Sequence, residues 1–224
     1  MKKALSLFCV MTMLFTLAAC SGQDNTASTP SSEASASQPA GTQAPDGSQL
    51  SPEDTAENTS SPEDGKVLVA YFSATGNTKG VAEQIAEYTG GDLYEIVPAE
   101  PYTAADLDYG NDQSRTSLEM NDPDARPEIG SEEISLGEYT TLYLGYPIWH
   151  GQAPRIMSTF VESYDFGGLT VIPFCTSGGS GIGSSAQTLA EQAGGGNWLA
   201  GQRFSGGVSD ADLQAWIEDL QQTV

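Results

Sequence analysis

The chain has 224 residues, and its 30 acidic and eight basic side chains give it a formal net charge of −22 at pH 7. A charge of this sign argues against nucleic acid and anionic lipid surfaces as partners. From Lys66 onward, 22 acidic residues face six basic ones, so this part alone carries a net charge of −16. Docking to a basic protein is compatible with that charge, and so is a surface that is merely solvated.

The first residues have the pattern of a secretory signal. Two lysines precede the apolar stretch 4–15, which is too short to span a membrane as a mature helix. The stretch ends in Leu-Ala-Ala-Cys at 17–20, which resembles a bacterial lipobox, where small residues precede a lipidated cysteine. The resemblance implies that residues 1–19 are removed and that acyl chains on Cys20 hold the protein at the extracytoplasmic face of the cell membrane. The alternative is an ordinary signal peptide followed by an incidental thiol.

Residues 20–65 are predicted to be the lipidated cysteine and a disordered linker. Between 21 and 65 there is no Lys, no Arg and no aromatic residue, and the apolar side chains are six alanines and Leu50. Such a segment buries too little surface to offset its chain entropy. Eight acidic residues with many Ser, Thr and Pro favour a solvated tether of roughly 35–40 Å root-mean-square span. A glycosylated stalk is the alternative.

The chain has three cysteines. Cys9 leaves with the signal and Cys20 is acylated, so Cys175 is left alone, and neither an internal disulfide nor a Cys-rich metal site is expected. Because Cys175 follows an apolar run, we interpret it as a small core residue rather than a nucleophile.

From Lys66 onward, apolar runs alternate with amphipathic segments. The run 67–72 lacks polar alternation and predicts a strand that is buried on both faces. A helical pattern over 77–88 and a short apolar run over 93–97 follow it. Together they predict a first βαβ unit.

Strands and helices alternate again further along the chain. Strands are predicted over 142–146, over 169–174 and around 197–199, with helices after Pro154, over 185–193 and after Ser209. Ser209 and Asp212, three residues apart, resemble a capping box, so Ser209 is predicted to cap the last helix. Pro173 either marks the end of its strand or occupies a position whose N–H is not needed. The stretch 100–138 is polar and acidic, and only a helix near 112–120 is expected in it. The pattern over 66–224 predicts one α/β domain, an open, mostly parallel sheet with helices on both faces.

Ligands of such sheets bind beyond the carboxyl ends of the strands, so the loops there are candidate sites. The loop after the first strand is Ser73-Ala74-Thr75-Gly76-Asn77-Thr78. Hydroxyl and amide side chains, a glycine and the free N–H groups of a helix start can together bind a phosphate dianion. Neither the P-loop nor the Gly-x-Gly-x-x-Gly pattern is present. An ordinary capped turn is the alternative.

The loop after the third strand carries Pro147, Ile148, Trp149, His150 and Gly151. A planar ring could stack on Trp149, or Trp149 could simply pack in the core. For His150, three roles stay open: contact with a bound ring, proton donation, and capping of the next helix.

The loop after the fourth strand contains Thr176, Ser177, Gly178, Gly179 and Gly181. Glycines let a backbone approach a flat ligand and present its N–H groups. The partial Gly-x-Gly-x-x-Gly match that ends at Ser184 is weak evidence for a dinucleotide site.

The three loops resemble those of the flavodoxin family. Residues 71–78 resemble the phosphate loop that holds FMN through hydroxyl and backbone donors. Residues 146–154 resemble the flavin-contacting loop of short-chain members, with His150 where many relatives carry a second aromatic residue. Residues 173–181 resemble the loop on the other side of the flavin. The resemblance covers nearly all of 66–224.

The resemblance implies a flavodoxin-like, doubly wound, five-stranded parallel sheet of order 2-1-3-4-5, with FMN bound non-covalently at its carboxyl edge. It also implies transfer of one or two electrons to or from a redox partner protein or a small quinone-like acceptor. We expect no catalytic residue and no metal in a membrane-anchored electron carrier. An FMN-dependent NAD(P)H or quinone reductase on the same fold is the alternative, so whether the protein is an enzyme stays open. A flavin-free binding module and a hydrolase are less favoured, the latter because Gly-x-Ser-x-Gly is missing and the chain has one His.

Overall fold

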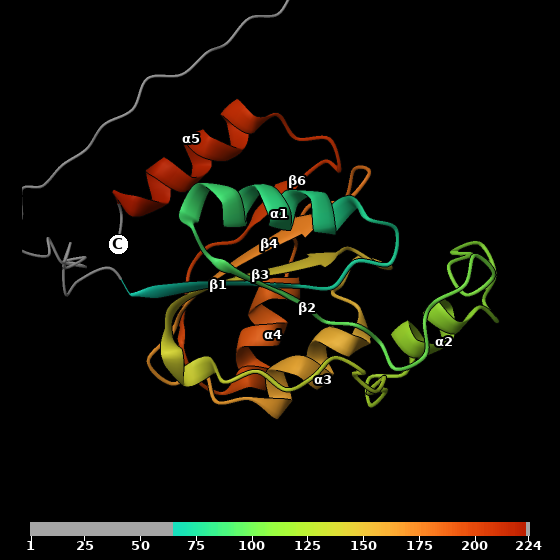
Figure 1. Cartoon of the computed structure of the whole chain (residues 1–224). Helices are drawn as coiled ribbons and strands as arrows, with labels where there is room; N and C mark the ends of the chain where they lie inside the picture. The colour runs from blue at the N-terminus through green and yellow to red at the C-terminus, as the bar shows by residue number, and fades with distance from the viewer. Residues whose placement is uncertain (1–64, 223–224) are drawn as a thin grey trace, which may run out of the picture. The chain divides into compact units, whose positions relative to one another are not determined.

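A sheet with helices on both faces is built from residues 65–222, the part of the chain that the computed structural model describes. The predicted signal peptide, Cys20 and the linker lie outside the described residues. The elements in chain order are β1 (Lys66–Tyr71), α1 (Asn77–Thr89), β2 (Asp92–Glu95), α2 (Arg115–Asn121), the 3-10 turn η1 (Leu136–Glu138), β3 (Tyr139–Pro147), α3 (Arg155–Ser163), β4 (Thr170–Thr176), α4 (Ser185–Ala193), β5 (Asn197–Trp198), β6 (Gln202–Phe204) and α5 (Asp210–Gln221) (Figure 1).

The sheet has the order β2-β1-β3-β4-β5, and its pairs are parallel. This confirms the predicted flavodoxin-like order. The fifth position of the sheet is shared by two short strands, because β5 pairs with Thr170 and Val171, whereas β6 pairs with the stretch 174–176 of β4. No pattern in the sequence predicted β6.

Pro173 lies inside β4, opposite Leu144 of β3, so its interpretation as a strand end is wrong. The carbonyl of Thr176 accepts from Ile148 on the β3 side, and the carbonyl of Val171 accepts from Leu199 on the other side. Alternate residues of a strand present their polar groups to opposite neighbours, so Pro173 faces the same way as Val171. That side is the gap between β5 and β6, where no ladder bond needs its N–H.

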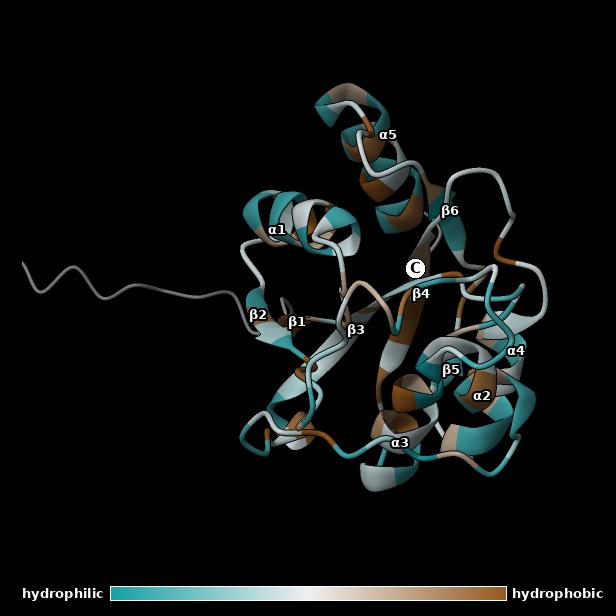
Figure 2. Cartoon of the chain, turned by 90° about the vertical axis from the view of Figure 1, so that its right-hand side faces the viewer, coloured by the Kyte–Doolittle hydropathy of each residue, from teal (hydrophilic) through white to brown (hydrophobic). Residues whose placement is uncertain are grey.

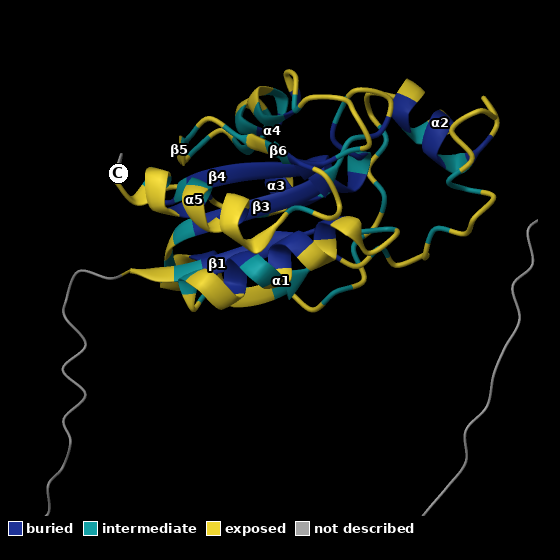
Figure 3. Ribbon diagram, turned by 90° about the horizontal axis from the view of Figure 1, so that it is seen from above, coloured by how far each residue is buried: buried dark blue, intermediate teal, exposed yellow. Residues whose placement is uncertain are grey.

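Two hydrophobic layers cover the sheet. Leu68 and Ala70 of β1 belong to the layer that also holds buried residues of α3 and α4, whereas Val69 and Tyr71 belong to the layer under α1 and α5. Figure 2 shows the hydrophobic residues of β4 between these helices, and Figure 3 shows the outer faces of α1 and α5 exposed. Each fully buried large apolar side chain stabilises the fold by about 1.5–3 kcal/mol, so burial on both faces explains the apolar strand sequences.

Helix ends follow local residue chemistry. The helix α5 begins at Asp210 because Ser209 caps it, accepting from the backbone N–H of Asp212, as the sequence predicted. The helix α4 spans the predicted residues 185–193. The helix α2 begins later than predicted because Ser114 is its cap and accepts from the N–H of Ser117. No helix among residues 65–222 combines the length and the apolar character needed to cross a membrane.

Candidate functional site

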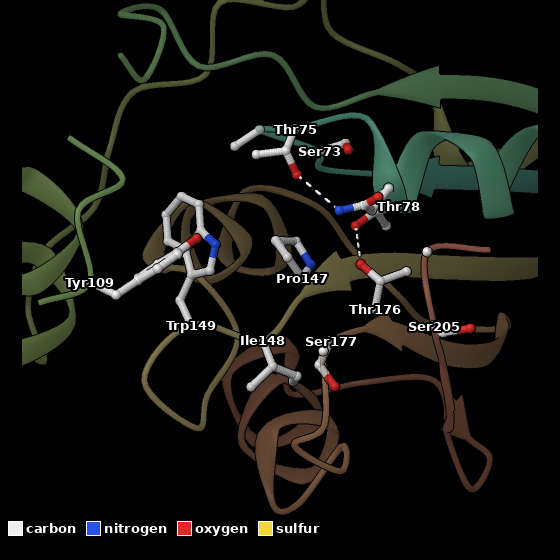
Figure 4. A pocket seen from close by; sticks show the side chains of 14 residues that line it. Ser73, Thr75, Thr78, Tyr109, Pro147, Ile148, Trp149, Thr176, Ser177 and Ser205 are labelled. Carbon is white, nitrogen blue, oxygen red and sulfur yellow. Dashed lines mark hydrogen bonds between the residues drawn. The ribbon is translucent and has the colours of Figure 1, made fainter. Parts of the chain in front are cut away.

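A cavity of about 370 Å³ opens at the carboxyl ends of β1, β3 and β4 (Figure 4). Its size is within the range of small-molecule sites, and its place is the point where the strand order reverses between β1 and β3. Eleven of the sixteen predicted residues line it: Ser73, Ala74, Thr75, Asn77, Thr78, Pro147, Ile148, Trp149, Thr176, Ser177 and Gly178. The five predicted residues outside the lining are Gly76, His150, Gly151, Gly179 and Gly181. Three lining residues were not predicted: Tyr109, Ser205 and Gly206.

The loop after β1 is shaped by its own side chains. Gly76 has a left-handed φ of 87°, and its N–H donates to Ser73 Oγ at 3.1 Å. The Asn77 amide donates to Thr75 Oγ1 at 3.2 Å. The buried hydroxyl of Thr78 forms a 2.8 Å hydrogen bond with that of Thr176, which ties the start of α1 to β4. These bonds define the shape of the loop.

The start of α1 has backbone donors to spare. The first hydrogen bond of this helix runs from Gly80 N–H to the Gly76 carbonyl, and no side chain of the described residues caps the helix. The N–H groups over 77–79 therefore lack helical acceptors, as in every helix start. Such donors, together with the helix dipole, favour an anion.

No charged side chain lines the cavity. Lys79 lies near the helix start, but its ammonium pairs with Glu95 at 3.4 Å, and Tyr71 also donates to that carboxylate. Burial and the nearby Glu95 charge raise the pKa of Tyr71, so its phenol stays neutral. A dianion at the start of α1 would therefore meet neutral donors alone.

The glycine-rich loop after β4 is held by β6. Ser177 N–H donates to the Phe204 carbonyl at 3.2 Å, and Arg203 Nε donates to Ser177 Oγ at 3.1 Å. The Arg203 guanidinium also donates to the Ser177 carbonyl, and the Ser177 hydroxyl donates to the carbonyl of Ser180. The three-residue strand that sequence analysis missed thus positions a loop that it predicted.

The turn after β6 reaches the loop after β1. A Cβ atom on Gly206 would lie 2.7 Å from Asn77 Cγ, which is closer than carbon atoms approach. Glycine therefore allows this turn to pack directly against the Asn77 side chain beside the cavity. The Gly-Gly pair that follows Ser205 signals a turn in the sequence, but nothing in the sequence says what the turn contacts.

The loop after β3 contains a tight turn. Trp149 and Gln152 exchange two backbone hydrogen bonds of 2.9 Å, and both residues between them have left-handed φ angles, 47° at His150 and 82° at Gly151. Two such residues make a type I′ turn, which explains the glycine. The turn places His150 outside the cavity, where it is exposed and its Nε2 lies 3.5 Å from Ser117 Oγ.

Of the three roles predicted for His150, capping of the next helix is wrong. The helix α3 begins after Pro154, and no side chain caps it. The helix instead has a proline before its first residue, so its entry is set by a fixed φ rather than by a side-chain acceptor.

Trp149 is both a core residue and a wall of the cavity. Its side chain is 2% exposed, and its ring meets Phe72 edge-on at 5.4 Å and Tyr102 at 5.0 Å between centroids. The ring centroid of Tyr109 lies 6.4 Å from that of Trp149. Core packing, one of the two roles predicted for Trp149, is therefore confirmed, while the same residue also lines the cavity.

The segment 99–121 brings Tyr109 to the cavity. Its helix α2 is joined to the rest of the domain by Arg155, which donates to the carbonyls of Glu119 and Met120 at 3.2 and 3.0 Å. Arg115 pairs with Glu119 at 2.6 Å, and Tyr102 donates to the same carboxylate. The sequence of this segment has no clear periodicity, so nothing in it pointed to Tyr109.

Comparison with known proteins agrees with this geometry. The flavodoxin family profile matches residues 66–220. The chain belongs to the flavodoxin family. A putative flavoprotein from Bacteroides uniformis is 50% identical, with a TM-score of 0.66 over 69% of this chain and 98% of that one. A second, from Bacteroides eggerthii, is 49% identical, with a TM-score of 0.64 over 69% of this chain and 96% of that one.

A flavoprotein structure with a bound ligand is also similar. A flavoprotein from Lactobacillus acidophilus, solved in complex with FMN, is 25% identical, with a TM-score of 0.52 over 68% of this chain and 99% of that one. No curated protein matches the chain. The family resemblance inferred from the three loops is confirmed, and with it a flavoprotein fold.

Proposed function

We propose that this domain binds one FMN non-covalently and serves as an electron carrier. The observation that carries the proposal is a single cavity that joins an uncapped helix start and a hydroxyl-rich loop to an aromatic wall. One end suits a phosphate dianion and the other suits a flat ring. The FMN complex of the Lactobacillus acidophilus relative supports the choice of this flavin.

The residues present fit the proposed cofactor. The free N–H groups over 77–79, with the hydroxyls of Thr75 and Thr78 and the side-chain amide of Asn77, would hold the phosphate. The ring system would lie between the loops after β3 and β4. A bound FMN supplies transfer of one or two electrons. The protein orients the ring, keeps carboxylates out of the cavity lining and leaves the cavity mouth open to a partner.

The basic residues favour a carrier over an NAD(P)H reductase. Each of the six basic side chains of the domain has partners: Lys66 with Asp92 and Glu138, Lys79 with Glu95, Arg115 with Glu119, Arg126 with Glu162, Arg155 with two carbonyls and Arg203 with Ser177. A nucleotide donor brings its own phosphates, which usually bind to free cations or helix starts. A redox protein with a basic face, or a quinone-like acceptor, needs neither a free cation nor a second helix start on this domain.

The same proposal includes a lipid anchor at the extracytoplasmic face of the membrane. It is supported by the lipobox-like run that ends at Cys20. Cys20→Ser is expected to move the protein from the washed membrane fraction to the soluble fraction. Retention of the variant in the membranes would contradict anchoring at this residue.

The decisive experiment is a titration of residues 66–224 with FMN, followed by visible absorbance and flavin fluorescence. Saturable binding of one FMN per chain is expected, and a protein that stays colourless at saturating FMN would overturn the proposal. Carrier and reductase are then separated with NAD(P)H and a quinone. Steady NAD(P)H consumption would indicate a reductase, whereas fast exchange with a redox protein and no NAD(P)H oxidation would indicate a carrier.

A further inference from the structure

Tyr109 is an exposed aromatic ring at the wall of the cavity. Its side chain is 50% exposed, whereas Trp149 beside it is 2% exposed. Phe72 and Tyr102 pack against the ring of Trp149 at interplanar angles of 84° and 79°. These core contacts cover part of the ring surface of Trp149. Figure 4 shows Tyr109 and Trp149 together on the side of the cavity away from Thr78 and Thr176. Tyr109 therefore offers a ligand the exposed ring surface that Trp149 lacks.

Tyr109 is held by a network of turns, although it belongs to a loop. Asp106 accepts from Thr103 at 2.7 and 2.8 Å, and its carbonyl accepts from the Thr116 hydroxyl at 2.7 Å. Asn111 N–H donates to the Asp108 carbonyl at 3.1 Å, which closes the turn around Tyr109 itself. A ring presented from such a segment loses little conformational entropy when a ligand covers it.

His150 supports Tyr109 from outside the cavity. Their ring centroids are 5.7 Å apart at an interplanar angle of 68°, and the Ser117 hydroxyl lies 3.5 Å from His150 Nε2. Tyr109 thus stands between His150 and Trp149 while it lines the cavity. Desolvation of the covered part of the side chain raises the pKa of Tyr109, so the phenol stays protonated at neutral pH and adds no charge to the wall.

We infer that Tyr109 makes the main side-chain ring contact with the bound flavin, and that Trp149 acts from behind as a positioning residue. This inference rests on the proposed function and goes beyond it, since it assigns a flavin-contacting role to the segment between β2 and β3. The physical basis is that an exposed phenol in a preformed wall can stack on a planar ring at little cost, whereas Trp149 would have to leave its packed site.

The test uses two ligands with the same ring system, FMN and riboflavin, which lacks the phosphate. They are titrated by fluorescence against the full chain in detergent and against its variants. Tyr109→Ala is expected to weaken both ligands by the same factor, about tenfold, because stacked aromatic pairs contribute about 1–1.5 kcal/mol. Tyr109→Phe is expected to bind both ligands within about twofold of the wild type, because it keeps the ring. Tyr88→Ala is the matched control, since Tyr88 is a 42% exposed tyrosine on α1 outside the cavity lining.

Each outcome decides the inference. Equal losses for both ligands, with Tyr109→Phe and Tyr88→Ala unchanged, support it. A wild-type chain that binds neither ligand overturns the proposed function and this inference together. A wild type that binds both, beside a Tyr109→Ala variant with unchanged affinities, overturns this inference alone. Loss of FMN without loss of riboflavin also overturns it, because Tyr109 would then act on the phosphate. If Tyr109→Ala lowers the Tm, Tyr109→Leu must show the same equal losses.

Discussion

The two ends of the cavity are built in different ways. At the hydroxyl end, formed by residues 73–78, two bonds that shape the loop join near neighbours, Gly76 N–H to Ser73 and the Asn77 amide to Thr75. A third bond, between the Thr78 and Thr176 hydroxyls, ties this loop to a distant strand. At the aromatic end, the rings of Phe72, Tyr102, Tyr109 and Trp149 come from three separate segments. The comparison shows that the hydroxyl end is shaped mostly within one short stretch, whereas the aromatic end needs several stretches to be folded together.

The largest effect is expected from removal of two polar side chains at the hydroxyl end. Thr75→Ala combined with Asn77→Ala should weaken FMN about 100-fold, because hydrogen bonds to a charged group contribute about 1.5 kcal/mol or more each. Riboflavin should bind almost as before, since it has no phosphate. Both affinities are measured by fluorescence titration. Thr89→Ala, at the far end of α1, is the control.

Unchanged FMN affinity in the double variant would place the phosphate elsewhere. Equal losses for FMN and riboflavin would mean that the two ends of the cavity are not separate, which would break the comparison.

A smaller loss at the same end is expected from Gly206→Ala. The new Cβ would lie 2.7 Å from Asn77 Cγ, so the Asn77 side chain must move away from its place beside the cavity. About tenfold weaker FMN binding is expected, equivalent to about one hydrogen bond to a charged group. Gly207→Ala is a matched control, because a Cβ there meets no atom within 4 Å. Equal FMN affinities for the two variants would contradict the contact.

A loss smaller again is expected from Arg203→Gln, which tests the support of the glycine-rich loop after β4. The substitution removes charge-assisted donors to Ser177, which lines the cavity. FMN and riboflavin should both weaken about fivefold, because loosening this loop costs about 1 kcal/mol and does not touch the phosphate. Arg126→Gln, whose partner Glu162 lies away from the cavity, serves as the control in the same titration. A loss confined to FMN would show that Arg203 acts on the phosphate charge instead.

The smallest effect is expected from a substitution away from both ends of the cavity, at the Arg126–Glu162 ion pair. Hydrogen bonding from Arg126 holds the pKa of Glu162 below its ordinary value of 4.5. A lowered carboxyl pKa stabilises the folded state above the ordinary value, and this stability is lost as the pH falls through the lowered pKa. Because the pair is largely exposed, Glu162→Gln should cost about 0.2–1 kcal/mol in urea unfolding near neutral pH.

The difference between wild type and Glu162→Gln should vanish in acid, where both side chains are neutral. A difference that grows as the pH falls would show that the pair acts with the opposite sign. Flavin affinity should be the same in both proteins, which makes this variant a measure of stability alone.

Local patterns predicted most of the scaffold. The buried strand at 66–71, the helix over 185–193 and the Ser209 cap were all legible because each depends on residues a few positions apart. Short or irregular pieces were not. The strand over 202–204 has too few residues for a pattern. Pro173 can lie inside β4 because it faces the gap between β5 and β6, and that gap is a feature of the folded sheet.

What this sequence determined by itself is the alternation of strands and helices, the family and the hydroxyl end of the cavity. Backbone propensity, hydrophobic period and short-range hydrogen bonds act over a few residues, so they can be inferred from the chain. The tertiary structure alone decided that Tyr109 and Gly206 line the cavity and that the turn at His150 and Gly151 lies outside its lining. Those placements depend on contacts between segments far apart in the chain, which no local pattern encodes.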